Sequence, residues 1–213
     1  MKNMPRMSLD RAIAGFDTAL RTLTSTAQSR RPYPTKAKEN IEQDPASRKE
    51  SGRLMRVNHC GEVCAQALYL GQSLTSRQTK TKEAMDKAAE EETDHLAWCT
   101  ERLRELNTKP SYLNPAFFSV SFATGALVGL LGDRINLGFV AATEEQVVKH
   151  LDKHIVKLPT ADLRSREILK QMRRDETEHL NSAIKQGASH LPTALKNVMS
   201  LASKVMTRST YWL

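Results

Sequence analysis

A ligand pattern of three residues occurs twice in this 213-residue chain. Each copy has a glutamate followed, 30 or 32 residues later, by a Glu-x-x-His pair: Glu62 with Glu92 and His95, then Glu144 with Glu176 and His179. One such pair is weak evidence, because six histidines and fifteen glutamates produce about 0.4 pairs by chance. The repeat at matched spacing is far more specific. Four carboxylates and two imidazoles are the ligand set of a dinuclear carboxylate site inside a four-helix bundle.

The donor types of this set define the chemistry that it can support. Carboxylates together with imidazole suit iron or manganese, and bridging carboxylates can hold two ions close together. Four glutamates carry four negative charges, which two divalent ions balance, so the site can be buried without a large desolvation cost. Oxidation of both ions adds two positive charges, which bridging oxygen ligands can neutralise. The pattern therefore predicts a redox site suited to reaction with O₂.

Other acidic residues and histidines near the pattern have plainer interpretations. Three glutamates are expected on solvated helix faces: Glu90, Glu91 and Glu178. Glu145 competes with Glu144 for the inward position, and the pattern leaves both open. His150 and His154, four residues apart, are expected at the surface or behind the ligands.

The spacing also dictates how the ligand-bearing segments fold. Thirty residues of straight helix would separate Glu62 from Glu92 by roughly 45 Å. The two can share a site only if the chain turns back near residue 77, in the polar stretch 75–80. The second copy requires a turn near residue 160, where Pro159 disfavours helix continuation. Both turns fall in suitable sequence, which predicts two helical hairpins.

The two hairpins are joined by a long connection, from about Asn107 to Asn136, and no segment shows strand-like alternation. This predicts an all-α, ferritin-like four-helix bundle with one long crossover and additional membrane-facing helices. We divide the chain into an N-terminal helix and basic, Pro-containing segment over 1–52, a bundle over 53–190 with its apolar crossover at 110–140, and a C-terminal amphipathic helix over 191–213.

The crossover is unusual because residues 110–132 contain no charged side chain. The apolar residues that dominate it are Phe117, Phe118, Val120, Phe122, Leu127, Val128, Leu130 and Leu131. Its helical part after Pro115 is about 17 residues, or roughly 25 Å, which is short for a bilayer span. A buried helix, a helix in the membrane interface and a true span all remain open. Gly125-x-x-x-Gly129 would permit close helix packing.

Two further helices are expected outside the bundle. Residues 8–23 carry an apolar stripe and Ser8 as a cap, and residues 25–52, interrupted by three prolines, are expected to form a loop or an extended segment. Residues 193–213 form an amphipathic helix that ends in Tyr211-Trp212-Leu213, where amphipathic aromatics suit a membrane surface. Packing of this helix on the bundle is the alternative to the membrane surface.

The composition indicates the kind of partner. A net charge of +8 and a pI near 9.5 favour an acidic partner, such as an anionic phospholipid surface. Nucleic acid is disfavoured, because only 5% of residues are aromatic and no nucleic-acid-binding motif occurs. Three cysteines without framework spacing favour a reducing compartment, and the N-terminus lacks the apolar region of a secretory signal.

Four segments of the chain resemble the demethoxyubiquinone hydroxylases of ubiquinone biosynthesis, bacterial members in particular. They are Leu54-Met-Arg-Val-Asn-His-Cys-Gly-Glu62, Glu90-Glu-Glu-Thr-Asp-His95, Ala142-Thr-Glu-Glu-Gln146 and Asp175-Glu-Thr-Glu-His179. The resemblance extends from about residue 50 onward. It implies two iron ions, with O₂ as co-substrate, and the ligands Glu62, Glu92, His95, Glu144, Glu176 and His179. It thereby selects Glu144 over Glu145.

The resemblance also implies a function and a set of partners. It implies a monooxygenase that hydroxylates the ring of a polyprenylated quinol, demethoxyubiquinol, at the cytoplasmic face of the inner membrane. A family histidine discussed in connection with electron delivery falls on His150, but Leu151 stands where the family has an aromatic residue. The electron donor is not specified, and a homo-oligomer or a complex of ubiquinone-biosynthesis proteins is open. The rival interpretation is a ferritin-like ferroxidase or iron-storage protein of the bacterioferritin type.

Overall fold

The structure, a computed structural model, describes residues 9–24, 27–35 and 44–213, with the backbone alone for residues 9–12. These residues form seven α-helices and, within those ranges, no β-strand. The helices are α1 (Leu9–Leu23), α2 (Pro45–Thr75), α3 (Thr79–Glu105), α4 (Asn114–Leu130), α5 (Asp133–Lys157), α6 (Leu163–Lys185) and α7 (Thr193–Trp212). The all-α prediction is confirmed for this part of the chain.

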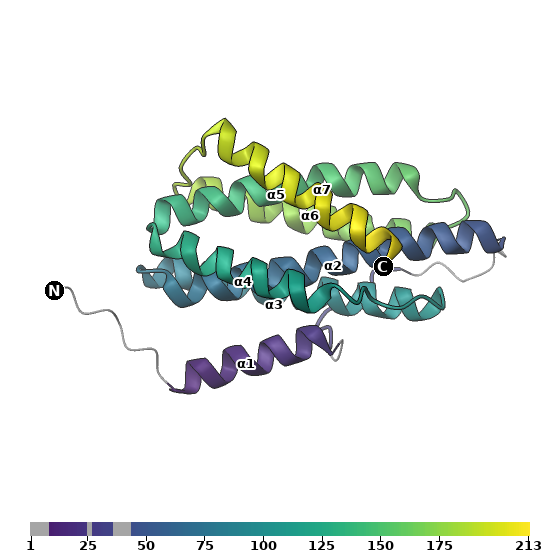
Figure 1. The fold of residues 1–213 in the computed structure, drawn as a ribbon, viewed down its shortest axis with the longest axis horizontal. Coiled ribbons are helices and arrows are strands. Elements are labelled where there is room, and N and C mark those ends of the chain that lie inside the picture. Colours follow the sequence, from purple (N-terminus) through teal and green to yellow (C-terminus); the bar gives the residue numbers. More distant parts are fainter. Residues whose placement is uncertain (1–8, 25–26, 36–43) are drawn as a thin grey trace.

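Two helical hairpins form the centre of the molecule. α2 pairs with α3 and α5 pairs with α6, while α4 lies along α2 and α7 crosses α2 and α5 (Figure 1). The first hairpin turns at residues 76–78 and the second at residues 158–162. Both turns lie where the ligand spacing predicted them, so the hairpin prediction is confirmed.

The start of α2 differs from the expectation. The prolines of the 25–52 segment predicted a loop or extended chain up to about Gly52, yet α2 begins at Pro45. Asp44 caps this helix by accepting hydrogen bonds from the backbone N–H groups of Ala46 and Ser47. Proline at the first position of a helix loses no hydrogen bond, because that N–H is unpaired anyway. Pro45 therefore starts a helix, and residues 36–43 and the proposed cap Ser8 lie outside the described residues.

Glycines bring α4 unusually close to α2. A β-carbon at Gly125 would collide with the Leu68 backbone, and one at Gly71 would collide with the backbone of α4 at Phe122. Gly129 similarly faces Thr75. The close packing expected from Gly125-x-x-x-Gly129 is confirmed, and it fixes the crossover helix on the hairpin that carries Glu62.

Two apolar layers enclose the ligand-bearing turns of the bundle. One layer includes Leu54, Trp98, Leu151 and Ile168, and the other includes Tyr69, Met85, Leu137 and Ala183. Each layer takes residues from all four bundle helices. On each helix the ligands of the repeated pattern lie between the two layers in sequence, so the apolar packing positions them without contributing to their chemistry.

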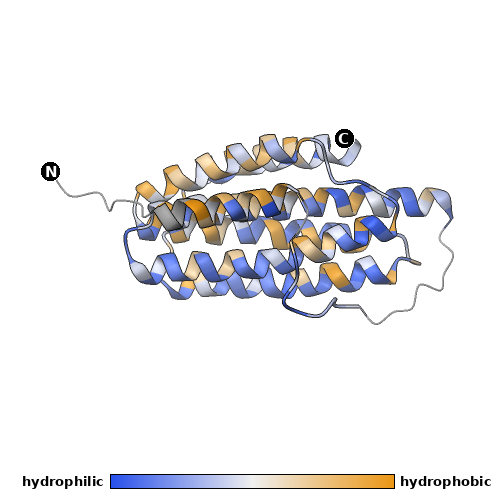
Figure 2. Cartoon of the chain, turned by 90° about the horizontal axis from the view of Figure 1, so that it is seen from below, coloured by the Kyte–Doolittle hydropathy of each residue, from blue (hydrophilic) through white to orange (hydrophobic). Residues whose placement is uncertain are grey.

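The outer helices leave apolar side chains exposed on one side of the molecule. We call this surface the apolar face and define it by Val120, Leu127, Leu130 and Leu131 of the crossover and Leu195, Val198, Leu201 and Val205 of α7, which are 38–65% exposed. Figure 2 shows the hydrophobic residues gathered on the side that carries the C-terminus and the hydrophilic ones on the opposite side. Phe118 and Val128 instead point into the protein.

The length and hydropathy of α4 bear on whether the crossover can span a membrane. Among the helices of the described ranges, α4 included, none combines the length and the apolar character needed to cross a bilayer. One side of α4 is buried against the bundle and its opposite side is exposed. The crossover helix is therefore buried on one side only.

Candidate metal centre

The structure brings all six residues of the repeated pattern together between the hairpins. They form two overlapping groups whose potential ligand atoms lie within 4.8 Å of one another. The first group is Glu62, Glu92, His95 and Glu176, and the second is Glu92, Glu144, Glu176 and His179. Glu92 and Glu176 belong to both groups. This is the arrangement expected of two neighbouring cation positions with two shared carboxylates.

Both imidazoles present the same nitrogen atom to the carboxylates. His95 Nδ1 lies 3.0 Å from Glu176 Oε1 and 3.1 Å from Glu92 Oε2. His179 Nδ1 lies 3.1 Å from Glu176 Oε2 and 3.4 Å from Glu92 Oε1. The carboxylates and His95 are almost completely buried, and the side chain of His179 is 10% exposed. The Nδ1 atoms are thus the available metal ligands.

The opposite nitrogen of each imidazole is held by an acid from the other hairpin. His95 Nε2 donates to Asp175 Oδ2 at 2.9 Å, and His179 Nε2 donates to Glu91 Oε2 at 2.7 Å. Each acid directly precedes a glutamate of the pattern, so the two helices brace one another's histidines. Such hydrogen bonds fix the tautomer and the ring orientation of metal-binding histidines. The expectation that Glu91 is merely solvated was wrong, because its carboxylate bonds His179 while remaining 29% exposed.

The electrostatics show that the cluster requires positive charge. Burial raises the pKa of Glu62 and of Glu144 well above the normal range of a glutamate. Burial acts against charge on His95, but hydrogen bonds to Asp175, Glu176 and further carboxylates raise its pKa well above normal. Four buried carboxylates at such short range repel one another. Protons or cations must compensate them, and divalent cations would do so with the donor atoms already in place.

Two residues that the sequence did not single out complete the surroundings. The Tyr69 hydroxyl, two helical turns after Glu62, donates a hydrogen bond to Glu144 Oε1. Arg31, from the Pro-containing segment before the bundle, bridges Asp94 and Asp175, with both contacts at 2.8 Å. Tyr69 lies on the same face of α2 as Glu62, and helical spacing could have identified it. No sequence signal marks Arg31.

The structure distinguishes the residues of the cluster from neighbouring acids and histidines. Glu145 points outward and pairs with Lys149 at 2.6 Å, whereas Glu144 is buried. Glu90 and Glu178 are exposed, as expected. The His150 ring contacts the His154 ring, with centres 3.9 Å apart and the planes tilted by 53°. His154 Nδ1 lies 3.0 Å from Oδ1 of Asn58, which is one turn before Glu62 on α2. These two histidines therefore form a separate polar group beside the cluster.

A cavity of about 510 Å³ reaches the cluster from between α3, α5 and α6. Its wall includes Tyr69, Glu91 and His179 and, nearer the rim, Lys87 and Ser182. It therefore contacts the half of the cluster that contains Glu144 and His179.

Comparison with known proteins identifies relatives over nearly the whole chain. The family model described as "Ubiquinone biosynthesis protein COQ7" matches residues 49–210. A "3-demethoxyubiquinol 3-hydroxylase" of Chromohalobacter salexigens is 54% identical over 205 residues, 96% of each chain. Proteins of the same name are 52% identical in Pseudomonas paraeruginosa, over 95% of each chain, and in Azotobacter vinelandii, over 95% of this chain and 94% of the relative.

Proposed function

We propose that this chain, which belongs to the ubiquinone biosynthesis protein COQ7 family, is a 3-demethoxyubiquinol 3-hydroxylase that uses O₂ and two iron ions. The observation that carries the proposal is the pair of overlapping ligand groups that share Glu92 and Glu176. The names of the relatives supply the substrate, demethoxyubiquinol. The six residues of the repeated pattern are proposed as the iron ligands.

The residues present fit iron. Glu62 Oε2 and Glu92 Oε1 are buried without a hydrogen-bond partner among the described residues, which is costly for a carboxylate oxygen unless a cation binds it. The donor set of carboxylate oxygen and imidazole nitrogen suits iron rather than a thiolate-preferring ion. Bound iron would supply the electrons that activate O₂ for ring hydroxylation.

The surrounding residues prepare the cluster for that chemistry. Asp175 and Glu91 hold the Nε2–H groups, so that each Nδ1 lone pair points toward the carboxylates. Tyr69 holds Glu144 through one oxygen and leaves the other for a cation. The apolar layers on both sides exclude water, which protects a reactive site from side reactions.

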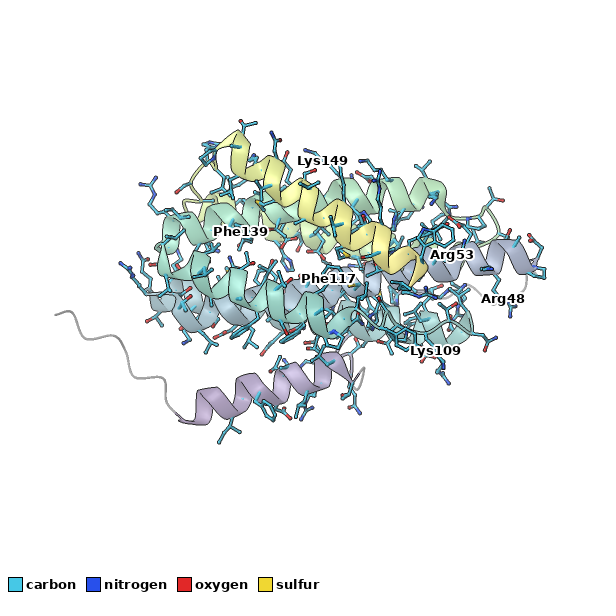
Figure 3. All side chains as sticks on the ribbon, in the orientation of Figure 1. Arg48, Arg53, Lys109, Phe117, Phe139 and Lys149 are labelled. Atoms are coloured by element: carbon cyan, nitrogen blue, oxygen red, sulfur yellow. The ribbon has the colours of Figure 1, made fainter. Side chains whose placement is uncertain are left out.

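The apolar face is a surface suited to membrane docking, which a lipid-soluble substrate requires. A polyprenylated quinol resides in the bilayer, and we propose that the apolar face docks peripherally on the cytoplasmic side of the inner membrane. Burial of apolar surface in lipid stabilises binding by about 25 cal/mol per Å², which sums to several kcal/mol. The Arg53 guanidinium lies 4.2 Å from the centre of the Trp212 ring, at the C-terminal end of α7 (Figure 3). Basic residues near anionic lipid contribute roughly 1 kcal/mol each.

A deletion strain tests the reaction directly. Deleting the protein should accumulate the demethoxy quinone and deplete ubiquinone, and the wild-type chain should restore the normal profile. The Glu62→Ala variant should be expressed but fail to restore it. An unchanged quinone profile in the deletion strain, with purified protein forming a mineral-loaded cage, would instead establish an iron-storage protein.

A further inference from the structure

The two halves of the ligand cluster differ in what separates them from solvent. The four ligands of each half are related by the repeated pattern, and each histidine is braced by one acid from the other hairpin. Beyond these acids the correspondence ends. Arg31 covers Asp175 on the His95 side, whereas Glu91 on the His179 side lines an open cavity.

The His95 side is closed by residues from outside the bundle. Arg31 donates through Nε to Asp94 and through Nη2 to Asp175, and its guanidinium lies 4.7 Å from the centre of the Trp98 ring. Asp94 also accepts hydrogen bonds from the Ser29 hydroxyl and the Arg30 backbone N–H. Residues 29–31 thus form a strap, and His95 beneath it is fully buried.

The His179 side communicates with solvent through the cavity. The Glu91 side chain is 29% exposed and its carboxylate lies 2.7 Å from His179 Nε2. The same carboxylate therefore contacts both the cavity and a histidine of the cluster. Lys87 lies 3.8 Å from the same carboxylate, near the cavity rim. Tyr69, which holds Glu144, also forms part of the cavity wall. A hydrated divalent cation entering here meets a carboxylate before it meets the cluster.

We infer that the two metal positions exchange cations at different rates. The Glu144–His179 position loads and releases divalent cations through the cavity, past Glu91. The Glu62–His95 position is closed by the Arg31 strap. This inference rests on the proposed metal site. It assigns Glu91 as a positioning residue that holds His179 at the exchangeable position, and Arg31 as a positioning residue that retains the other cation.

The test follows release of Co²⁺ from the full-length, Co²⁺-loaded chain into excess EDTA, by visible absorption. The wild type should release two ions in two phases of equal amplitude. Glu144→Ala should remove the fast phase and Glu62→Ala the slow one. Glu91→Gln should accelerate the fast phase by about tenfold, because loss of the acid behind a metal-binding histidine weakens binding by that order.

Matched variants separate the strap and the cavity from general destabilisation. Arg31→Gln should accelerate only the slow phase. Arg31→Lys, which retains the charge but lacks the planar guanidinium that contacts both carboxylates, should accelerate it less. Ser182→Phe at the cavity rim should slow only the fast phase. The side chains of Arg30 and Glu90, which directly precede Arg31 and Glu91, pair with each other at the surface. Arg30→Gln and Glu90→Gln leave the Arg30 backbone N–H bond to Asp94 in place, so they should change neither phase.

The outcomes distinguish this inference from the proposed function. Two bound ions that leave in a single phase would overturn the inference alone, as would acceleration of the fast phase by Arg31→Gln or a fast phase unaffected by Ser182→Phe. A chain that binds Co²⁺ at less than two ions and is insensitive to both Glu62→Ala and Glu144→Ala would overturn the metal site itself.

Discussion

At the scale of single residues, the central feature is that neighbouring acids have different roles. In each Glu-x-x-His segment the glutamate faces the cluster, while the acid before it bonds the histidine of the other hairpin. Position on the helix thus decides whether a carboxylate faces the cluster, as the proposed ligands do, or holds a histidine by a hydrogen bond. The same geometry distinguishes Glu144 from Glu145, which are adjacent and chemically identical.

Substitution of these two neighbours tests the assignment. Glu144→Ala should bind fewer metal ions and lose hydroxylation, because a buried ligand and the acceptor of Tyr69 are removed together. Glu145→Ala should retain both properties, because its carboxylate only pairs with Lys149 and Lys196 at the surface. Metal content and quinol turnover of the two variants provide the measurement. Equal losses in both would show that the inward position has been misassigned.

A buried histidine outside the cluster should make stability depend on pH. Burial lowers the pKa of His59 from 6.5 to about 4. The unfolded chain therefore binds a proton that the folded chain excludes, so His59 favours the fold above pH 6.5 and this contribution is lost as pH falls toward 4. From pH 7 to pH 5 the loss should be about 2 kcal/mol.

Urea unfolding of the wild type and of His59→Gln at both pH values isolates this effect, because the other titrating groups are common to the two proteins. The wild type should lose more stability than the variant on acidification. An identical loss in both proteins would contradict the assignment of a buried neutral imidazole.

At the scale of the helices, close contact between α2 and α4 fixes the crossover. Gly125→Ala should destabilise the protein by about 1–3 kcal/mol, because the added carbon meets the Leu68 backbone, which cannot move aside locally. Gly61→Ala is the matched control: it lies within α2 with open space around it, and should be neutral or stabilise the helix by about 0.5–1 kcal/mol. Thermal unfolding of both variants tests the contact; equal effects would contradict it.

The helices also show how far sequence reasoning reaches. Spacing predicted both hairpin turns and the clustered residues, except for the choice between Glu144 and Glu145. Helix geometry requires the chain to turn back before distant ligands can meet, whereas Glu144 was selected only by the family resemblance. Spacing did not predict the start of α2. A proline can interrupt a helix or begin one, and only the hydrogen bonds from Asp44 show that Pro45 begins α2. Glu91 and Arg31 were missed for a different reason. Their roles depend on tertiary contacts, with His179 in one case and Asp175 in the other, that no local pattern encodes.

At the scale of the whole molecule, the bundle has two chemically different sides. The apolar face lies over α4 and α7, and the cavity opens between α3, α5 and α6. The proposed membrane-docking surface and the opening for the exchangeable cation thus lie over different helices. This separation would keep the cation route available while the protein is bound to a membrane.

Membrane docking through the apolar face can be tested by charge insertion. Leu127→Asp combined with Leu201→Asp should abolish flotation with anionic vesicles while leaving metal content unchanged, because both side chains are more than 60% exposed. Ile184→Asp on α6 is the control, since Ile184 is 58% exposed but lies outside the apolar face. Flotation that persists in the double variant, or is lost equally in the control, would exclude this docking surface.

The most direct test of the account is the iron content of the anaerobically reconstituted chain, measured together with that of Glu176→Ala. Glu176 is shared by both ligand groups, so its removal affects both positions. We predict about two iron ions per wild-type chain and a loss of iron in the variant, whose helical content remains close to that of the wild type. A stoichiometry of one ion per chain, or two ions retained by Glu176→Ala, would contradict a dinuclear centre at this site.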